Sequence, residues 1–216
     1  MRTRYSIDLR GSSTHHTLLT LVPFGARVLD LGCASGYLGE ALARQQCVVW
    51  GVDKDADALA SVPSGAYTAL AAVDLDAPVP WPFGTQQFDV ILAADVLEHL
   101  AHPDRLLRWL PDLLAPQGIV LVSLPNVAHF TVRFRLLAGH FDYTDSGILD
   151  RTHLHLYTFA SARRLVEASG FRVTQVLGGS VWVGALINRG IWPMPRLRGL
   201  FASGIVVVAT SQRASV

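Results

Sequence analysis

The residues most suggestive of chemistry lie near the start of the chain, in the segment Val28-Leu29-Asp30-Leu31-Gly32-Cys33-Ala34-Ser35-Gly36. An apolar run there enters a Gly-x-x-x-Gly turn, and glycine lets a backbone turn sharply and approach a ligand closely. Asp53 follows at the end of the next apolar run, where its carboxylate could bind the hydroxyl groups of a ribose. These residues predict a nucleotide-like ligand at the C-terminal edge of a parallel sheet.

The spacing of the glycines and the charge of Asp30 narrow the choice of ligand. A glycine turn with a downstream aspartate fits NAD, FAD, a methyl donor or a simple tight turn. The pyrophosphate-binding pattern Gly-x-Gly-x-x-Gly is absent, because Ala34 stands between Gly32 and Gly36. A carboxylate at Asp30 would repel a pyrophosphate and attract a positively charged ligand. S-adenosylmethionine carries a sulfonium and an ammonium group, so we expect this cofactor.

Several segments, in the same order, resemble the motifs of class I S-adenosylmethionine-dependent methyltransferases. VLDLGCASG is similar to the first motif, VVWGVDKD to the second, and residues 71–75 to the third. FDVILAADVLEHLAHPDRLL resembles the segment that follows the fourth strand in the ubiquinone-biosynthesis type, and LLAPQGIVLVSLPN the next helix and strand. The likeness covers roughly residues 5–177. It departs from the commonest pattern at Ala34, where glycine is usual and a small residue should be tolerated.

The resemblance implies a role for each matching residue. The methionine part of the cofactor would be lined by the first motif, namely Asp30, Gly32, Cys33, Ala34 and Gly36. The ribose would be held by Asp53, with Lys54 beside it. The adenine would be framed by Asp74 and Leu75. The floor beneath the sulfonium would be formed by Ala94, Asp95 and Val96.

Histidines beyond the fifth strand are candidate catalytic bases. Methyl transfer from a sulfonium needs no metal, but an oxygen or nitrogen acceptor that carries a proton usually needs a base. His129 and His153 are favoured because imidazole titrates near neutrality. A structural hydrogen-bond network of Asp150, Arg151 and His153 explains that segment equally well. His153 and His155 with Asp150 are a weak metal pattern, and we expect no metal.

The segment that holds these histidines resembles a bacterial methyltransferase subgroup associated with surface polysaccharides and small-molecule pathways. The resemblance implies a small-molecule acceptor of the sugar, phenol or secondary-metabolite type. Arg133, Arg135 and Arg151 could meet an anionic acceptor, although a solvated helix face explains the first two nearly as well. The alternative function is a non-catalytic S-adenosylmethionine-binding or scaffold protein with the same fold.

Composition excludes several other classes. The 216 residues suit one α/β domain, and a net charge of +1 gives no basic field for nucleic acid. Cys33 and Cys47 form neither a disulfide framework nor a zinc motif. The polar start of the chain has no apolar signal core, and no apolar run is long enough to span a membrane. We therefore expect a cytoplasmic monomer or homodimer with no nucleic-acid partner and no integral membrane contact.

Apolar runs alternate with helical patterns, which predicts a Rossmann-like α/β fold with helices on both faces of the sheet. The sheet should have seven strands, mostly parallel, with the last one antiparallel. We expect strands at residues 27–33, 48–53, 67–75, 88–95, 118–124, 171–177 and 204–210. We expect helices at residues 36–46, 55–61, 103–114, 127–137 and 159–169. One domain should span 1–216, with an N-terminal cover at 1–26 and acceptor-site or cover insertions at 127–158 and 178–203.

Overall fold

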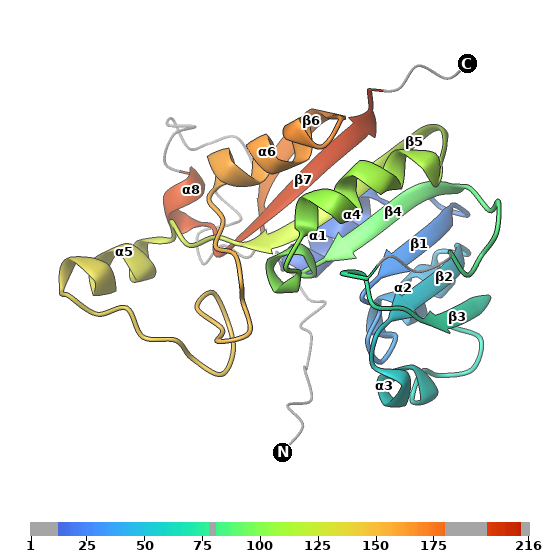
Figure 1. The fold of residues 1–216 in the computed structure, drawn as a ribbon, viewed down its shortest axis with the longest axis horizontal. Coiled ribbons are helices and arrows are strands. Elements are labelled where there is room, and N and C mark those ends of the chain that lie inside the picture. The colour runs from blue at the N-terminus through green and yellow to red at the C-terminus, as the bar shows by residue number, and fades with distance from the viewer. Residues whose placement is uncertain (1–12, 78–80, 180–197, 213–216) are drawn as a thin grey trace.

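The computed structural model describes residues 13–77, 81–179 and 198–212. Its centre is a seven-stranded sheet in the order β3-β2-β1-β4-β5-β7-β6 (Figure 1). The strands are β1 (Arg27–Leu31), β2 (Val48–Asp53), β3 (Ala69–Ala72), β4 (Phe88–Ala94), β5 (Leu114–Pro125), β6 (Phe171–Gly179) and β7 (Gly204–Ser211). β7 runs antiparallel to both of its neighbours, β5 and β6, and the other pairings are parallel. The predicted fold class is confirmed.

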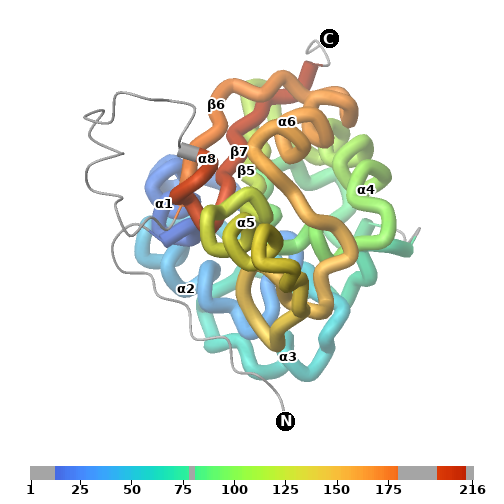
Figure 2. Tube along the Cα trace, turned by 90° about the vertical axis from the view of Figure 1, so that its left-hand side faces the viewer, coloured from blue at the N-terminus to red at the C-terminus, as the bar shows by residue number. Residues whose placement is uncertain are grey.

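Helices cover both faces of the sheet. They are α1 (Thr14–Leu21), α2 (Tyr37–Arg44), α3 (Ala56–Ala60), α4 (Pro103–Trp109), α5 (Phe130–Leu137), α6 (Phe159–Ala168) and α8 (Arg198–Phe201), with short 3-10 helices η1 (Leu97–His99) and η2 (Leu110–Asp112). Figure 2 shows α1 and α2 on one side of the sheet and α4 and α6 on the other. None of the helices in the described ranges is long and apolar enough to cross a membrane.

Side chains that point alternately to the two faces of the central strands form both layers of the core. Val90 and Leu92 of β4 pack into the cluster that holds α1 and α2, whereas Ile91 and Ala93 pack into the cluster with α4 and α6. Successive side chains of a strand point to opposite faces, so a strand buried on both faces reads as a continuous apolar run. This is why β4 reads as apolar almost throughout.

The strand order reverses at β1, which pairs with β2 on one side and β4 on the other. In an open α/β sheet, ligands bind in the crevice outside the C-terminal ends of the strands at such a reversal. The glycine turn after β1 and the segment after β4 both begin there. The topology therefore brings two of the predicted motifs to one edge of the sheet.

Several predicted boundaries are wrong for local reasons. The helix expected at residues 103–114 is α4, which ends at Trp109 and continues as the 3-10 turn η2. Pro111 has no amide hydrogen to donate to a preceding carbonyl, so the α-helical pattern stops there. β5 begins at Leu114 rather than 118, and its pairing with β4 is irregular between Phe88 and Val90. β3 covers only Ala69–Ala72.

The helix expected from residue 127 begins at Phe130. Asn126 is fully buried. Its side-chain Nδ2 donates to the carbonyls of Gly199 and Ala202, and its Oδ1 accepts from the Ala128 backbone amide. These bonds hold residues 126–128 in a turn. Parts of the expected covers, residues 1–12 and 180–197, lie outside the described residues.

Candidate active site

A cavity of about 1120 Å³ opens at the C-terminal ends of the central strands. The predicted site residues that line it are Gly32, Ala34, Asp53, Lys54, Ala94, Asp95 and His153. The predicted residues that do not line it are Asp30, Cys33, Gly36, Asp74, Leu75, Val96 and His129. Within the second group, Asp30, Cys33 and Val96 lie in or directly behind the glycine turn, as the contacts below describe.

The glycine turn is fixed to β2 by backbone hydrogen bonds. The amides of Gly32 and Cys33 both donate to the Val52 carbonyl, at 2.8 and 3.0 Å. Gly32 has φ +69°, and a Cβ atom added there would lie 2.6 Å from Cγ2 of Val96. Val96 thus packs behind the turn, and the position requires glycine for both its conformation and its space.

Asp53 holds the next part of the turn. Its Oδ2 accepts a hydrogen bond from the Ala34 amide at 2.9 Å, and its Oδ1 accepts from the Asp55 amide at 2.8 Å. Ala34 has φ +46°, a left-handed conformation that explains why glycine is the commoner residue there. Asp53 lines the cavity with lone pairs left to accept hydrogen bonds from a ligand.

Asp30 lies beneath the turn and not in the cavity wall. It is 1% exposed, and its Oδ2 accepts a hydrogen bond from the Tyr67 hydroxyl at 2.6 Å. That hydroxyl in turn accepts from the Gly39 amide at 3.2 Å. Burial raises the pKa of Asp30 to about 7, although the Tyr67 hydrogen bond acts in the opposite direction. Sequence reasoning did not identify Tyr67, which lies 37 residues away along the chain.

Asp95 projects from the end of β4 in a strained conformation. Its φ is +54°, and the Ser123 hydroxyl makes two hydrogen bonds with it: the Asp95 amide donates to Ser123 Oγ at 3.0 Å, and that hydroxyl donates to Asp95 Oδ1 at 2.7 Å. The Asp95 amide also donates to the Ser123 carbonyl at 3.3 Å. Nε2 of His15, from α1, lies 3.3 Å from Asp95 Oδ2. Both Asp95 and His15 line the cavity. Non-glycine residues in left-handed conformations are concentrated at functional sites.

The two residues predicted to frame an adenine lie outside the cavity lining. Asp74 is exposed, and its Oδ1 accepts from the Asp76 amide at 3.0 Å. Leu75 packs against the core on the α4 side. Asp76 accepts hydrogen bonds from the amides of Ala101 and His102, which ties this loop to the segment before α4.

The structure separates the two candidate bases. His129 is the N-cap of α5, with Nδ1 2.7 Å from Thr131 Oγ1, and burial lowers its pKa. His153 lines the cavity, and its Nδ1 lies 3.1 Å from the Ile148 carbonyl oxygen. His153 therefore lines the cavity, whereas His129 does not, and a catalytic role for either histidine stays a prediction.

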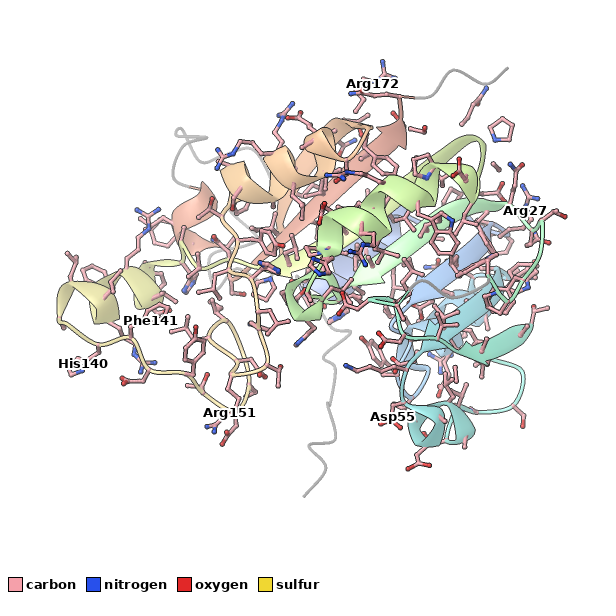
Figure 3. The ribbon with its side chains drawn as sticks, viewed as in Figure 1. Arg27, Asp55, His140, Phe141, Arg151 and Arg172 are labelled. Atoms are coloured by element: carbon pink, nitrogen blue, oxygen red, sulfur yellow. The ribbon has the colours of Figure 1, made fainter. Side chains whose placement is uncertain are left out.

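The arginines that suggested an anionic acceptor lie away from the cavity. Arg135 pairs with Asp142 at 3.3 Å, Arg151 pairs with Asp145 at 2.6 Å, and Arg133 donates to the Ala128 carbonyl. Figure 3 shows Arg151 on the outer side of the loop that follows α5. None of these three arginines lines the cavity.

Glu98 is a cavity-lining residue to which sequence reasoning assigned no role. It is fully buried, and burial, followed by the charge of Asp95, raises its pKa well above the ordinary value. With His99 and His153 it forms the group of described residues whose types and distances could hold a metal ion. The expectation that no metal takes part stays a prediction.

Comparisons with known proteins agree with this geometry. Residues 9–176 match the sequence profile of a methyltransferase domain. The chain belongs to the methyltransferase-domain family. It is 31% identical over 169 residues to a ubiquinone biosynthesis O-methyltransferase of Azorhizobium caulinodans, covering 76% of this chain and 66% of the relative. It is 28% identical over 165 residues to the enzyme of the same name from Aeromonas salmonicida (strain A449), covering 72% and 66%. The methyltransferase chain thus spans just under two thirds of the length of these curated relatives.

Solved structures show the same fold. An S-adenosylmethionine dependent methyltransferase from Mesorhizobium loti superimposes with a TM-score of 0.62 at 17% identity, covering 90% of this chain and 95% of that one. Magnesium protoporphyrin IX methyltransferase from Synechocystis PCC 6803, solved with bound SAH, gives a TM-score of 0.62 at 16% identity, with coverages of 92% and 82%. The expectation of a class I methyltransferase with a Rossmann-like fold is confirmed.

Proposed function

We propose that this methyltransferase transfers a methyl group from S-adenosylmethionine to a hydroxyl oxygen of a small molecule. The observation that carries the proposal is a single cavity lined by both the glycine turn with Asp53 and a histidine suited to act as a base. The sequence relatives are ubiquinone biosynthesis O-methyltransferases, which supports oxygen over nitrogen as the methylated atom.

The residues that line the cavity suit the donor in charge. Gly32 contributes backbone alone to the lining, with Val96 packed behind it. Asp53 would accept hydrogen bonds from the ribose, and the carboxylate of Asp95 would favour a positively charged group nearby. When bound, S-adenosylmethionine supplies a methyl group that is already activated by its positively charged sulfur.

The acceptor would be served by His153. A carbonyl oxygen only accepts hydrogen bonds, so the 3.1 Å contact with Ile148 places the ring hydrogen on Nδ1 and leaves Nε2 bare. That nitrogen would take the proton that the hydroxyl loses as its oxygen is methylated. A positioned base of this kind contributes roughly 100-fold to 10,000-fold in rate.

The first experiment is calorimetric titration with S-adenosylhomocysteine of the wild type, Asp53→Ala and Asp142→Ala. We expect binding in the micromolar range that Asp53→Ala abolishes and Asp142→Ala preserves, because Asp142 is exposed and lies outside the cavity lining. Binding by the wild type should be followed by transfer of labelled methyl groups to sugars and phenols.

The outcomes separate the two functions considered. No binding by the wild type would refute the proposal. Binding without transfer to any sugar, phenol or amine would instead support the alternative of a non-catalytic protein that keeps the donor site.

A further inference from the structure

Three side chains at one end of the cavity, Glu98, His99 and His153, form a group that we name the acceptor triangle. One nitrogen or oxygen atom of each lies within 4.8 Å of the others, and all three residues line the cavity. The rings of His99 and His153 meet edge to face, with centroids 4.9 Å apart. The function proposed above uses only His153, so the other two require an explanation.

Hydrogen bonds to carbonyl groups orient both imidazole rings. Nδ1 of His99 lies 3.2 Å from the Thr152 carbonyl oxygen, and Nδ1 of His153 lies 3.1 Å from that of Ile148. The Thr152 hydroxyl donates to Asp150 at 2.7 Å, so towards His99 it too can only accept. In each neutral ring the hydrogen therefore sits on Nδ1, and Nε2 is a hydrogen-bond acceptor. Burial lowers the pKa of His99, which favours this neutral form.

Glu98 supplies the complementary group. It is 0% exposed, and neither carboxyl oxygen has a hydrogen-bond partner among the described residues. Its main-chain carbonyl accepts from the amides of Leu154 and His155, so η1 and the segment around His153 are held together. Burial raises the pKa of this carboxyl, which favours its neutral form, and that form has one hydrogen to donate. Leaving such a buried polar group without a hydrogen-bond partner is unfavourable.

The charges around the cavity disfavour an anionic acceptor. Among the described lining residues Lys54 is the single lysine or arginine, whereas the acidic ones are Glu40, Asp53, Asp55, Asp57, Asp95, Glu98 and Asp150. The triangle itself offers two bare nitrogens and a carboxyl hydrogen, with no permanent cation. These groups match a hydroxyl, which both donates and accepts, better than a carboxylate or phosphate.

We propose that Glu98 and His99 complete the acceptor site, and that the triangle binds the hydroxyl group of an uncharged acceptor. The hydroxyl hydrogen points to Nε2 of His153 or of His99, and the hydroxyl oxygen accepts from the Glu98 carboxyl. His99 is then a second acceptor for the same proton, so either histidine alone supports part of the reaction. The inference rests on the proposed methyltransferase function and names its acceptor-binding residues.

The test uses the full chain saturated with S-adenosylhomocysteine, with phenol as the hydroxyl probe and benzoate as its anionic counterpart. Nitrogen NMR of the imidazole rings should show Nε2 of His99 and His153 without hydrogen, and phenol but not benzoate should shift both signals. Glu98→Leu should weaken phenol binding about tenfold, as expected for one lost hydrogen bond, while Glu98→Gln, which keeps a donor, should retain it. His155→Gln is the matched control, because His155 lies two residues away and contacts the Ala101 carbonyl outside the cavity lining.

Two results would overturn the inference while leaving the proposed function intact, since donor binding is measured separately. One is that phenol shifts neither imidazole although S-adenosylhomocysteine binds. The other is a stoichiometric metal ion in the purified protein, measured by mass spectrometry and lost in Glu98→Gln, which would assign the triangle to a cation. Loss of all donor binding would refute the proposed function itself.

Discussion

The two ends of the cavity are built in different ways. The donor end, around Gly32 and Asp53, is a short motif whose groups are satisfied by neighbouring backbone amides and carbonyls. The acceptor end joins η1 to the loop around His153, about 50 residues later, and contains a buried carboxyl at Glu98 without a partner among the described residues. Local backbone hydrogen bonds thus fix the shape of the donor end before a ligand arrives, whereas both carboxyl oxygens of Glu98 at the acceptor end have no partner among the described residues.

The largest expected effect is at the donor end. Gly32→Ala should destabilise the protein by about 2–5 kcal/mol, because it adds the cost of a left-handed alanine to a clash with Val96. Gly25→Ala is the matched control: its φ is +73°, but a Cβ atom there has nothing within 4 Å, so only about 1–2 kcal/mol should be lost. Urea unfolding measures both. Equal losses would show that the contact with Val96 does not constrain the turn.

The next effect depends on pH and concerns the buried Asp30. Its folded-state pKa of about 7 lies above the ordinary aspartate value of 3.8, so the unfolded chain releases this proton first as pH rises. The contribution of Asp30 to stability should therefore fall between about pH 4 and pH 7, by up to about 4 kcal/mol, and stay level above pH 7. Asp30→Asn removes the ionisation and should remove this decline from the pH series of unfolding free energies.

Asp89 is expected to show the opposite pH dependence of stability, because its pKa is lowered in the folded state. The hydrogen bond from Arg27 lowers the pKa of this carboxyl, so its contribution is present at neutral pH and is lost on acidification. Asp89→Asn should therefore lower stability at pH 7 and have less effect in acid.

The Asp30 prediction has its own contradicting outcome. If the unfolding free energy of Asp30→Asn still declines between about pH 4 and pH 7, the decline belongs to another buried group, such as Glu98.

The smallest effect on stability is expected for Ser123→Ala, which acts on the cavity-lining residue Asp95. Ser123→Ala removes the hydroxyl that bonds both the amide and the carboxylate of this strained residue. We expect a loss of about 1 kcal/mol in unfolding free energy and weaker binding of S-adenosylhomocysteine. Calorimetry would check the second part, and unchanged donor affinity would show that Ser123 serves only the fold. Thr210→Ser, in neighbouring β7, is a conservative control outside the cavity lining.

The sequence by itself determined the sheet and the glycine turn that follows β1. Continuous apolar runs identify strands buried on both faces, and the Gly32 turn with Asp53 is recognisable because its conformation depends on residues close in the chain. Two predicted helix boundaries were wrong. One helix ends early because Pro111 lacks an amide hydrogen, and the other begins late because the side chain of Asn126 bonds to distant carbonyl groups. Residue type alone indicates that such groups exist but not where they bond.

Only the tertiary structure decided which polar residues meet. It placed Asp30 behind the turn against Tyr67, brought Ser123 and His15 to Asp95, and separated His153 from His129. It also placed the buried Glu98, which the sequence did not distinguish from a surface acid, beside two half-buried histidines in the cavity wall. Hydrogen bonds of this kind join residues tens of positions apart in the sequence. Only the folded chain sets the distances between such residues, their burial and the pKa shifts that follow.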